Sequence, residues 1–371
     1  MGESIKWKKK NRDQGDGHGA KEILTNLKKR EEMEMRKIAL ISCLTILFAG
    51  FSSIDRAFAQ KPIELSYSVF QPAAHKATLL SKEWTEEIGK RTNGRVKITV
   101  FPGGILSPPD KCYQGVITGV SDIGYSVLGY TKGRFPLAEV FDTPLGIKSG
   151  VMSTKLANEY TKRFQPKEFD DTKFMYFHGN GPGLLHTKKP VYNLQDLKGM
   201  KIRTAGPMSN LIAHLGGTPV GMPMGEAYDA LSKGVIEGIL CPIEALEGFK
   251  LAEVTKYTTE CYCIGYTGIH FTTMNKDKWN ALPPDIQKII NDMNEEWIKK
   301  TGLMWDEVDQ SGKEFALKLG HQMIPLSKAE EERWIKALEP LFDEYVKNMK
   351  AKGLPGEEVL KFCMDFLKKN Q

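Results

Sequence analysis

A long amphipathic segment near the C-terminal end limits the folds that are open to this chain. From Pro284 to Leu319 apolar side chains recur three and four residues apart, which is the spacing of one face of an α-helix. An unbroken helix of this length would measure about 50 Å at 1.5 Å per residue. That length exceeds one small domain, so we predict a helix that braces two domains, with Gly302 and Gly312 as positions where it could bend. The repeating residues are Ile286, Ile289, Ile290, Met293, Trp297, Met304, Trp305 and Val308.

Before this helix, predicted strands and helices alternate in two successive series. Such alternation is typical of α/β domains whose sheets are largely parallel. The first series has strands at 64–70, 96–101 and 122–126, with helices at 73–91 and 109–118. The second has strands at 173–178, 200–203, 218–222 and 238–241, with helices at 194–197, 208–215 and 225–233. A further β-rich segment at 267–274 is long enough to cross between two sheets.

These elements predict an α/β fold in which two mixed-sheet domains close like a clamp, with the long helix spanning both. No low-complexity linker separates the two series, so the chain is expected to cross repeatedly between the domains. We predict domain I at 60–180 plus 267–306, and domain II at 181–266 plus 307–371.

The N-terminal segment has the pattern of an export signal. Arg36 and Lys37 precede an uncharged run of 14 residues at 38–51, and Ala57-Phe58-Ala59 has the small residues of a cleavage site. The run is shorter than the roughly 18 apolar residues that a membrane span needs. We therefore predict a signal peptide at 35–59 that is cleaved after Ala59, with an uncleaved anchor as the alternative. Residues 1–34 are expected to be a disordered extension, or the product of a start site placed too far upstream.

Charge and cysteine content exclude several classes of protein. The net charge is +6, but residues 1–59 carry +4 of it, so 60–371 is nearly neutral and has no basic stripe for nucleic acid. Removal of Cys43 with the signal leaves an odd number of cysteines, and Cys261-x-Cys263 has no matching Cys or His pair nearby. We expect buried or half-buried thiols, no metal and no cofactor. The remaining cysteines are Cys112, Cys241, Cys261, Cys263 and Cys363.

Arg203 is the sharpest candidate for a binding residue. It ends a short predicted strand that follows a turn at Gly199, and the segment 204–207 then opens a helix. In open α/β sheets the ligand lies at the carboxyl ends of strands. There a guanidinium can donate two parallel hydrogen bonds to a carboxylate or sulfonate, and a helix N-terminus adds partial positive charge. On position alone, a structural salt bridge or an exposed side chain is equally open.

An ordered series of short motifs resembles the solute-binding proteins of tripartite ATP-independent periplasmic (TRAP) transporters, in the dicarboxylate-receptor-like DctP family. The resemblance implies two α/β domains of the periplasmic binding protein type. It also implies an extracytoplasmic receptor that binds a small organic acid in a Gram-negative-type periplasm and delivers it to membrane permease subunits. The motifs are 72–76, 101–104, 119–124, 187–191, 196–203, 216–220, 222–226, 228–231, 234–238 and 241–242.

The same resemblance suggests which residues form the site. It implies that Arg203 clamps a carboxylate, that Tyr125 contacts ligand just after a strand, and that Met224 forms an apolar wall. Two positions depart from the family pattern: Cys241 stands where many relatives have Asn, and Gly183 where others have a second Arg. Both departures remove polar groups, which favours a monocarboxylate with a compact, partly apolar remainder.

Four further residues could supply neutral hydrogen bonds to such a ligand. They are His75, His178, Asn180 and Tyr266. His75 could instead cap the first helix, and His178 could be a satisfied histidine within a strand. We expect the protein to act as a monomer.

Three other functions compete with this interpretation. An exported enzyme is disfavoured because the sequence has no Gly-x-Ser-x-Gly elbow, His-Glu-x-x-His motif, phosphate loop or dinucleotide fingerprint. A receptor that reports to a periplasmic sensor fits the same residues. A binding protein of an ATP-driven importer is disfavoured by the long helix and the Arg203 segment.

Overall fold

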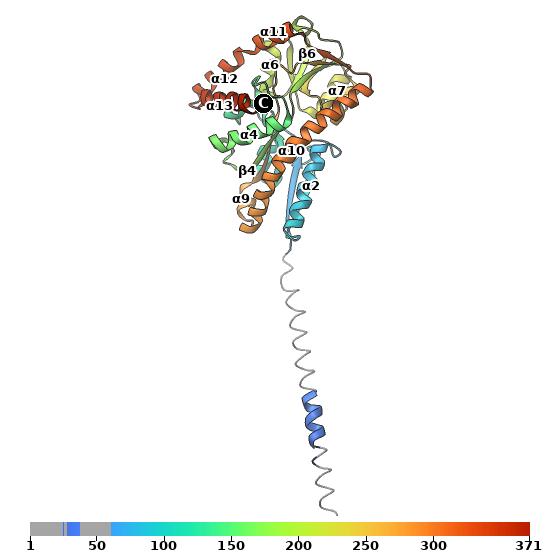
Figure 1. Ribbon diagram of the computed structural model, residues 1–371, viewed down its shortest axis with the longest axis vertical. Helices are drawn as coiled ribbons and strands as arrows, with labels where there is room; N and C mark the ends of the chain where they lie inside the picture. The colour runs from blue at the N-terminus through green and yellow to red at the C-terminus, as the bar shows by residue number, and fades with distance from the viewer. Residues whose placement is uncertain (1–24, 26–27, 38–60) are drawn as a thin grey trace, which may run out of the picture. The chain divides into compact units, whose positions relative to one another are not determined.

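The computed structural model describes residue 25, residues 28–37 and residues 61–371 (Figure 1). Pro62–Gln371 is one compact unit. In the described chain, both β-sheets and all three clusters of buried apolar side chains lie within this unit. Among the described residues, no helix is both long and apolar enough to cross a membrane.

Residues 28–37 are helical, which corrects the predicted disorder of 1–34 over its last seven residues. The segment is exposed throughout, and Lys37 pairs with Glu34 one turn away, at 3.0 Å. Helix-forming Lys, Arg, Glu and Met residues with such pairs favour a local helix without a tertiary partner. The predicted signal peptide from residue 38 onward, with its cleavage site after Ala59, lies outside the described residues.

The first sheet has the strand order β2-β1-β3-β10-β4. Strand β1 is parallel to β2 and β3, whereas β10 is antiparallel to both β3 and β4, so the sheet is mixed as predicted. The predicted strand at 267–274 does not cross between sheets, because β10 pairs within this sheet over its whole length. The strands are β1 (Ile63–Val69), β2 (Val96–Phe101), β3 (Ile123–Val127), β4 (Thr172–Gly179) and β10 (Ile269–Asn275).

The second sheet has the order β11-β9-β5-β8-β6-β7 and is also mixed. Strand β6 is parallel to β7 and β8, and β5 is antiparallel to β8 and β9. We call each sheet with its covering helices a lobe, the first lobe and the second lobe. The strands are β5 (Gly183–Thr187), β6 (Lys201–Thr204), β7 (Thr218–Gly221), β8 (Gly238–Pro242), β9 (Tyr257–Glu260) and β11 (Gln322–Pro325).

The long helix α10 (Pro284–Lys318) confirms the predicted brace, with 35 residues in one element (Figure 1). It packs on α2 (Lys76–Arg91) and α4 (Gly150–Phe164) of the first lobe and on α8 (Ala245–Gly248) of the second. Its two glycines allow close approach. A Cβ at Gly302 would lie 3.1 Å from the Cα of Val151, and one at Gly312 would lie 2.6 Å from the carbonyl oxygen of Ile243.

The C-terminal helices divide between the lobes. Helix α11 (Lys328–Leu338) packs in the core of the second lobe. Helices α12 (Pro340–Ala351) and α13 (Gly356–Asn370) instead share a core with Phe141 and Leu156 of the first lobe. This packing differs from the predicted assignment to domain II, because apolar faces on these helices do not specify which core they join.

The described chain passes between the lobes four times: at 180–182, at 261–268, along α10, and between α11 and α12. These repeated crossings agree with the prediction from the absence of a linker. The exact domain boundaries stay a prediction.

The cysteines Cys112, Cys241, Cys261 and Cys363 are buried free thiols, and Cys263 is half-buried, which confirms the expected thiols. Within the described residues, no group of three or more His, Cys, Asp or Glu side chains is placed to hold a metal ion.

Candidate ligand-binding site

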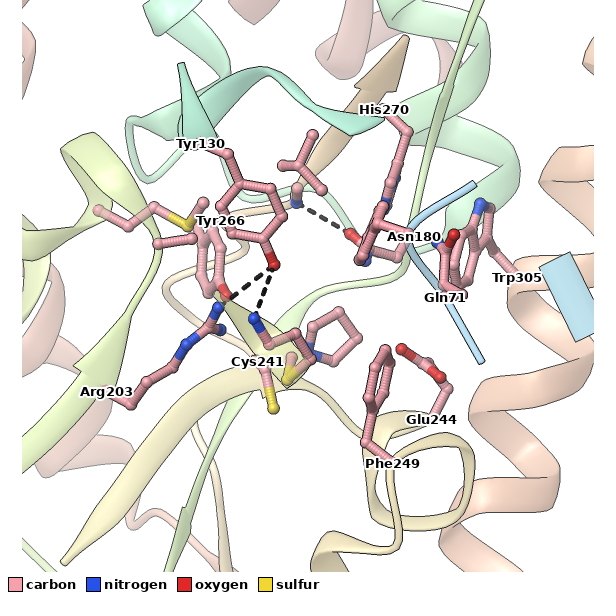
Figure 2. Close-up of a pocket in the computed structure, with 17 residues that line it drawn as sticks. Gln71, Tyr130, Asn180, Arg203, Cys241, Glu244, Phe249, Tyr266, His270 and Trp305 are labelled. Atoms are coloured by element: carbon pink, nitrogen blue, oxygen red, sulfur yellow. Dashed lines mark hydrogen bonds between the residues drawn. The ribbon is translucent and has the colours of Figure 1, made fainter. Parts of the chain in front are cut away.

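A cavity lies where strand ends of the two lobes meet (Figure 2). Both lobes contribute to its lining, and so do the connection at 261–268 and the helix α10. The first lobe supplies Phe70, Gln71, Val127, Tyr130, Asn180 and His270. The second supplies Arg203, Ala205, Met208, Met224, Cys241, Pro242, Glu244 and Phe249. The connection at 261–268 supplies Tyr266 and Gly268, and α10 supplies Trp305.

Arg203 is a buried cation with no counter-ion among the described residues. Its side chain leaves β6 with only 2% of the residue exposed. Nε and Nη2 donate to the carbonyl oxygen of Met222 at 2.9 and 2.7 Å. No carboxylate among the described residues pairs with it, and Nη1 has no hydrogen-bond partner there. Because a buried charge is stable only when it is compensated, this guanidinium favours an anionic ligand.

Tyr130 connects the lobes at this guanidinium, and the sequence analysis missed it. Its hydroxyl accepts hydrogen bonds from Nη2 of Arg203 at 3.3 Å and from the backbone N–H of Met224 at 3.2 Å, both drawn in Figure 2. The sequence analysis chose Tyr125, on β3 itself. Along this segment the lining includes Val127 at the end of β3 and Tyr130 three residues later, in a short 3₁₀ helix.

Five of the predicted residues line the cavity: Arg203, Asn180, Met224, Cys241 and Tyr266. The Oδ1 atom of Asn180 accepts from the N–H of Gly268 at 2.9 Å, which leaves its Nδ2 donor without a partner among the described residues. Met224 and Cys241 form apolar wall. Burial raises the pKa of the Cys241 thiol, so it presents a neutral, weakly polar surface.

The other four predicted residues do not line the cavity, but each supports a residue that does. Tyr125 is hydrogen-bonded to Gln71 and fully buried behind it. His178 accepts from the indole N–H of Trp305 at 3.0 Å and stacks on His270, with ring centroids 4.9 Å apart. His178 is therefore a satisfied strand histidine, the alternative that the sequence left open.

Gly183 lies beneath Tyr266. A Cβ atom there would be 1.9 Å from the ring carbon Cε1 of Tyr266. The Tyr266 hydroxyl donates to the carbonyl oxygen of Leu240 at 3.1 Å, which holds the ring in this place. The space that a side chain on β5 would enter is thus filled by an aromatic ring.

His75 caps α2, as one of the two sequence interpretations held. Its Nδ1 accepts from the backbone N–H of Ala77 at 3.1 Å, and its Nε2 lies 3.0 Å from Oε2 of Glu244. Since Nδ1 is an acceptor, the ring proton of the neutral form is on Nε2 and is donated to Glu244. Both side chains are buried, so this bond joins the two lobes beside the cavity.

Four further residues with rings, Phe70, Phe249, His270 and Trp305, also line the cavity. Phe70 stacks on His270 with centroids 6.1 Å apart, and His270 stacks on Trp305 at 5.1 Å. Burial lowers the pKa of His270 to about 3, so this ring is neutral near neutral pH. The sequence analysis missed these three residues and Phe249. Phe70 could have been found, because it ends a predicted strand at the edge where ligands bind.

Three comparisons place the chain among known proteins. The profile of the bacterial extracellular solute-binding proteins of family 7, named DctP, matches residues 67–348. A TRAP periplasmic solute-binding protein of Desulfovibrio salexigens is 34% identical, with a TM-score of 0.74 over 83% of this chain and 97% of that one.

Two further solved structures hold aromatic acids. A TRAP solute-binding protein of Rhodoferax ferrireducens, crystallised with copurified benzoate, is 29% identical, with a TM-score of 0.79 over 83% of this chain and 98% of that one. A marine metagenome protein crystallised with 3-hydroxybenzoate is 31% identical, with a TM-score of 0.79 over 84% and 99%. Structural neighbours of lower identity hold D-glucuronate and orotic acid.

The family match covers most of the chain, and the two mixed sheets and the spanning helix α10 agree with it. Members of this family are transport proteins that bind small organic anions and work with membrane components. The chain therefore belongs to family 7 of the bacterial extracellular solute-binding proteins, and is a solute-binding receptor of the TRAP type.

Proposed function

We propose that this receptor binds a small aromatic monocarboxylate through Arg203 and delivers it to the membrane permease subunits of a TRAP transporter. The observation that carries the proposal is a guanidinium with no carboxylate partner among the described residues, in the wall of a cavity that also has the aromatic side chains of Phe70, Phe249 and Trp305. A carboxylate would take the free donors of Arg203, and a flat apolar ring would lie among Phe70, Phe249 and Trp305.

The polar groups present favour such a ligand over a sugar acid. A sugar acid carries hydroxyl groups around its whole ring, and each would need a partner once it is buried. The chain lacks the second Arg and the Asn that the resemblance places at Gly183 and Cys241, and the Tyr266 hydroxyl is already bonded to Leu240. The benzoate and 3-hydroxybenzoate held by two relatives support the same ligand class.

The lining also supports a closing motion driven by the ligand. The proposed carboxylate would contact Arg203 of the second lobe, while the ring would contact Phe70 and His270 of the first lobe. A ligand that touches both lobes favours the closed arrangement over any open one. In this proposal Asn180, Met224, Cys241 and Tyr266 contact the ligand directly.

Residues outside the cavity have supporting roles in the same proposal. Tyr125 and His178 hold Gln71 and Trp305 in place, and Gly183 makes room for Tyr266. The transport role includes export to the periplasm with cleavage after Ala59, and action as a monomer.

A thermal-shift screen followed by calorimetry tests this proposal on the purified protein. The panel pairs benzoate and its hydroxy derivatives with succinate, malate and D-glucuronate at equal concentrations. We expect aromatic monocarboxylates to raise the unfolding temperature most and to bind with one site per chain. Binding of only the dicarboxylates or the sugar acid would overturn the proposed ligand class and leave the family assignment intact.

A further inference from the structure

Glu244 places a carboxylate in the wall of the cavity, at a distance from the cationic end. Figure 2 shows Arg203 and Glu244 reaching the cavity from opposite sides, with Phe249 beside Glu244. Only 4% of Glu244 is exposed. A buried carboxylate is costly unless its oxygens receive hydrogen bonds, so its partners decide what it does.

One of the two carboxylate oxygens of Glu244 is already used. His75 donates from Nε2 to Oε2 at 3.0 Å, and the cap of α2 fixes the proton on that nitrogen. The other oxygen, Oε1, has no hydrogen-bond partner among the described residues. An ionised carboxylate only accepts hydrogen bonds, so Oε1 offers an acceptor and nothing else.

The backbone holds Glu244 firmly in this position. Its N–H donates to Oδ1 of Asp309 on α10 at 3.2 Å. The turn that carries it passes directly over Gly312, where a Cβ would lie 2.7 Å from the Cα of Glu244. The carboxylate is therefore fixed from both sides, by α10 through the main chain and by His75 through the side chain.

Gln71 gives independent support for a polar group of the ligand in this cavity. Its side-chain amide is held at one end by the Tyr125 hydroxyl. Its other end is the buried Oε1 atom, which has no partner in the described chain although it belongs to a residue that lines the cavity. Buried polar atoms without partners are uncommon, and such an atom in a binding cavity indicates a group that the ligand supplies.

We propose that Glu244 is a specificity-determining residue that accepts a hydrogen bond from the ligand at the end remote from its carboxylate. This inference rests on the proposed function and narrows its ligand class to aromatic monocarboxylates that carry a hydroxyl or amino donor on the ring. The same carboxylate disfavours a second acidic group there, because two like charges would meet beside a buried side chain.

Calorimetry with matched probes tests the proposal. The probes are benzoate, 3- and 4-hydroxybenzoate, 3- and 4-aminobenzoate, and the dicarboxylates isophthalate and terephthalate. The proteins are the wild type, Glu244→Gln, and the control Glu247→Gln. Glu247 lies one turn further on, is exposed, and accepts its hydrogen bond from Ser311 outside the cavity.

We expect the wild type to bind its better hydroxybenzoate or aminobenzoate at least about tenfold more tightly than benzoate, as a bond to a charged acceptor would give. In Glu244→Gln this preference should fall below about threefold, while dicarboxylate binding should strengthen because the amide can donate. Glu247→Gln should match the wild type, and benzoate binding by Glu244→Gln shows that this variant is folded.

Other outcomes separate the two proposals. Tight benzoate binding with no gain from a ring donor would overturn the role of Glu244 and leave the aromatic monocarboxylate in place. An equal preference for the hydroxybenzoate or aminobenzoate over benzoate in the wild type and in Glu244→Gln would also overturn the role of Glu244. Failure of all these aromatic acids to bind the wild type would overturn the proposed function, and this inference with it.

Discussion

The ring of Tyr266 occupies the space into which a side chain at Gly183 would extend, since a Cβ there would lie 1.9 Å from Cε1 of Tyr266. The two residues come from different segments, Gly183 from β5 and Tyr266 from the connection that returns to the first lobe. They act as a pair, so neither can be changed without consequences for the other.

Substitution of Gly183 by Ala is expected to destabilise the protein by about 1–3 kcal/mol, because it overpacks a buried site. In a Tyr266→Ala background the same change should cost much less, since the ring is gone. Denaturant unfolding of the four proteins measures this coupling. An equal cost in both backgrounds would show that the ring is not the obstacle.

The pair also changes what is expected from an arginine at this position. Gly183→Arg was expected from the sequence to shift specificity toward more polar acids. With Tyr266 in place the new side chain has no room, so the shift should appear only in Gly183→Arg combined with Tyr266→Gly. A ligand screen that finds the shift in the single variant would contradict the pairing.

Replacement of Arg203 by Ala should weaken binding of an aromatic carboxylate by about 2–5 kcal/mol, because a charge-assisted pair is lost at a buried side chain. Calorimetry on the purified variant measures this loss. Lys201→Ala, on the same strand but exposed, is the matched control and should bind as the wild type does. Nearly unchanged affinity in Arg203→Ala would remove it as the anchor.

Two substitutions of His75 separate its two roles. His75→Asn retains a side chain that caps helices well but is too short to reach Glu244, whereas His75→Ala loses both contacts. We expect the Ala variant to be about 1 kcal/mol less stable than the Asn variant in denaturant unfolding. Both variants should lose the preference for a ring donor. Equal stability of the two would argue against the cap.

The stability of the protein should fall in mild acid, in part through His186. Its two ring nitrogens bond the Thr258 hydroxyl and the Cys241 carbonyl oxygen, and burial lowers its pKa to about 3. The unfolded chain takes up this proton near pH 6.5, whereas the folded chain does so only near 3. Stability is therefore full above pH 6.5 and is lost as the pH falls toward 3, by about 2 kcal/mol at pH 5.

Urea unfolding at pH 7.5 and pH 5 checks this expectation. The wild type should lose more stability between the two conditions than His186→Gln, which carries no titrating ring at this position. Other titrating groups contribute equally to both proteins and cancel in the comparison. The same loss in both would show that His186 keeps an ordinary pKa.

The parts of the fold that sequence predicted are those coded by local patterns. The apolar repeat from Pro284 predicted α10 to within one residue of its end, because helical periodicity needs no knowledge of the partner. The same information did not place α13. An amphipathic helix shows that a face is buried, but not which core receives it.

In the candidate site, too, the residues placed by a local pattern were predictable and those placed by tertiary packing were not. Arg203 was predictable because it ends a strand at the edge where ligands bind. Tyr130, Glu244 and Trp305 were missed, since their positions depend on turns and on how α10 crosses the second lobe. Tyr125 and His178 were chosen on nearby strands, and both lie one layer behind the cavity.

The position of β10 has a consequence for the order of folding. It pairs with β3 and β4 in the middle of the first sheet, yet it begins about 90 residues after β4 ends, once nearly all of the second sheet has been made. Until then two strand edges stay unpaired, and pairings this distant in sequence form slowly. Neither lobe can finish before the other is largely complete, so the two should assemble as one cooperative unit and not as independent modules.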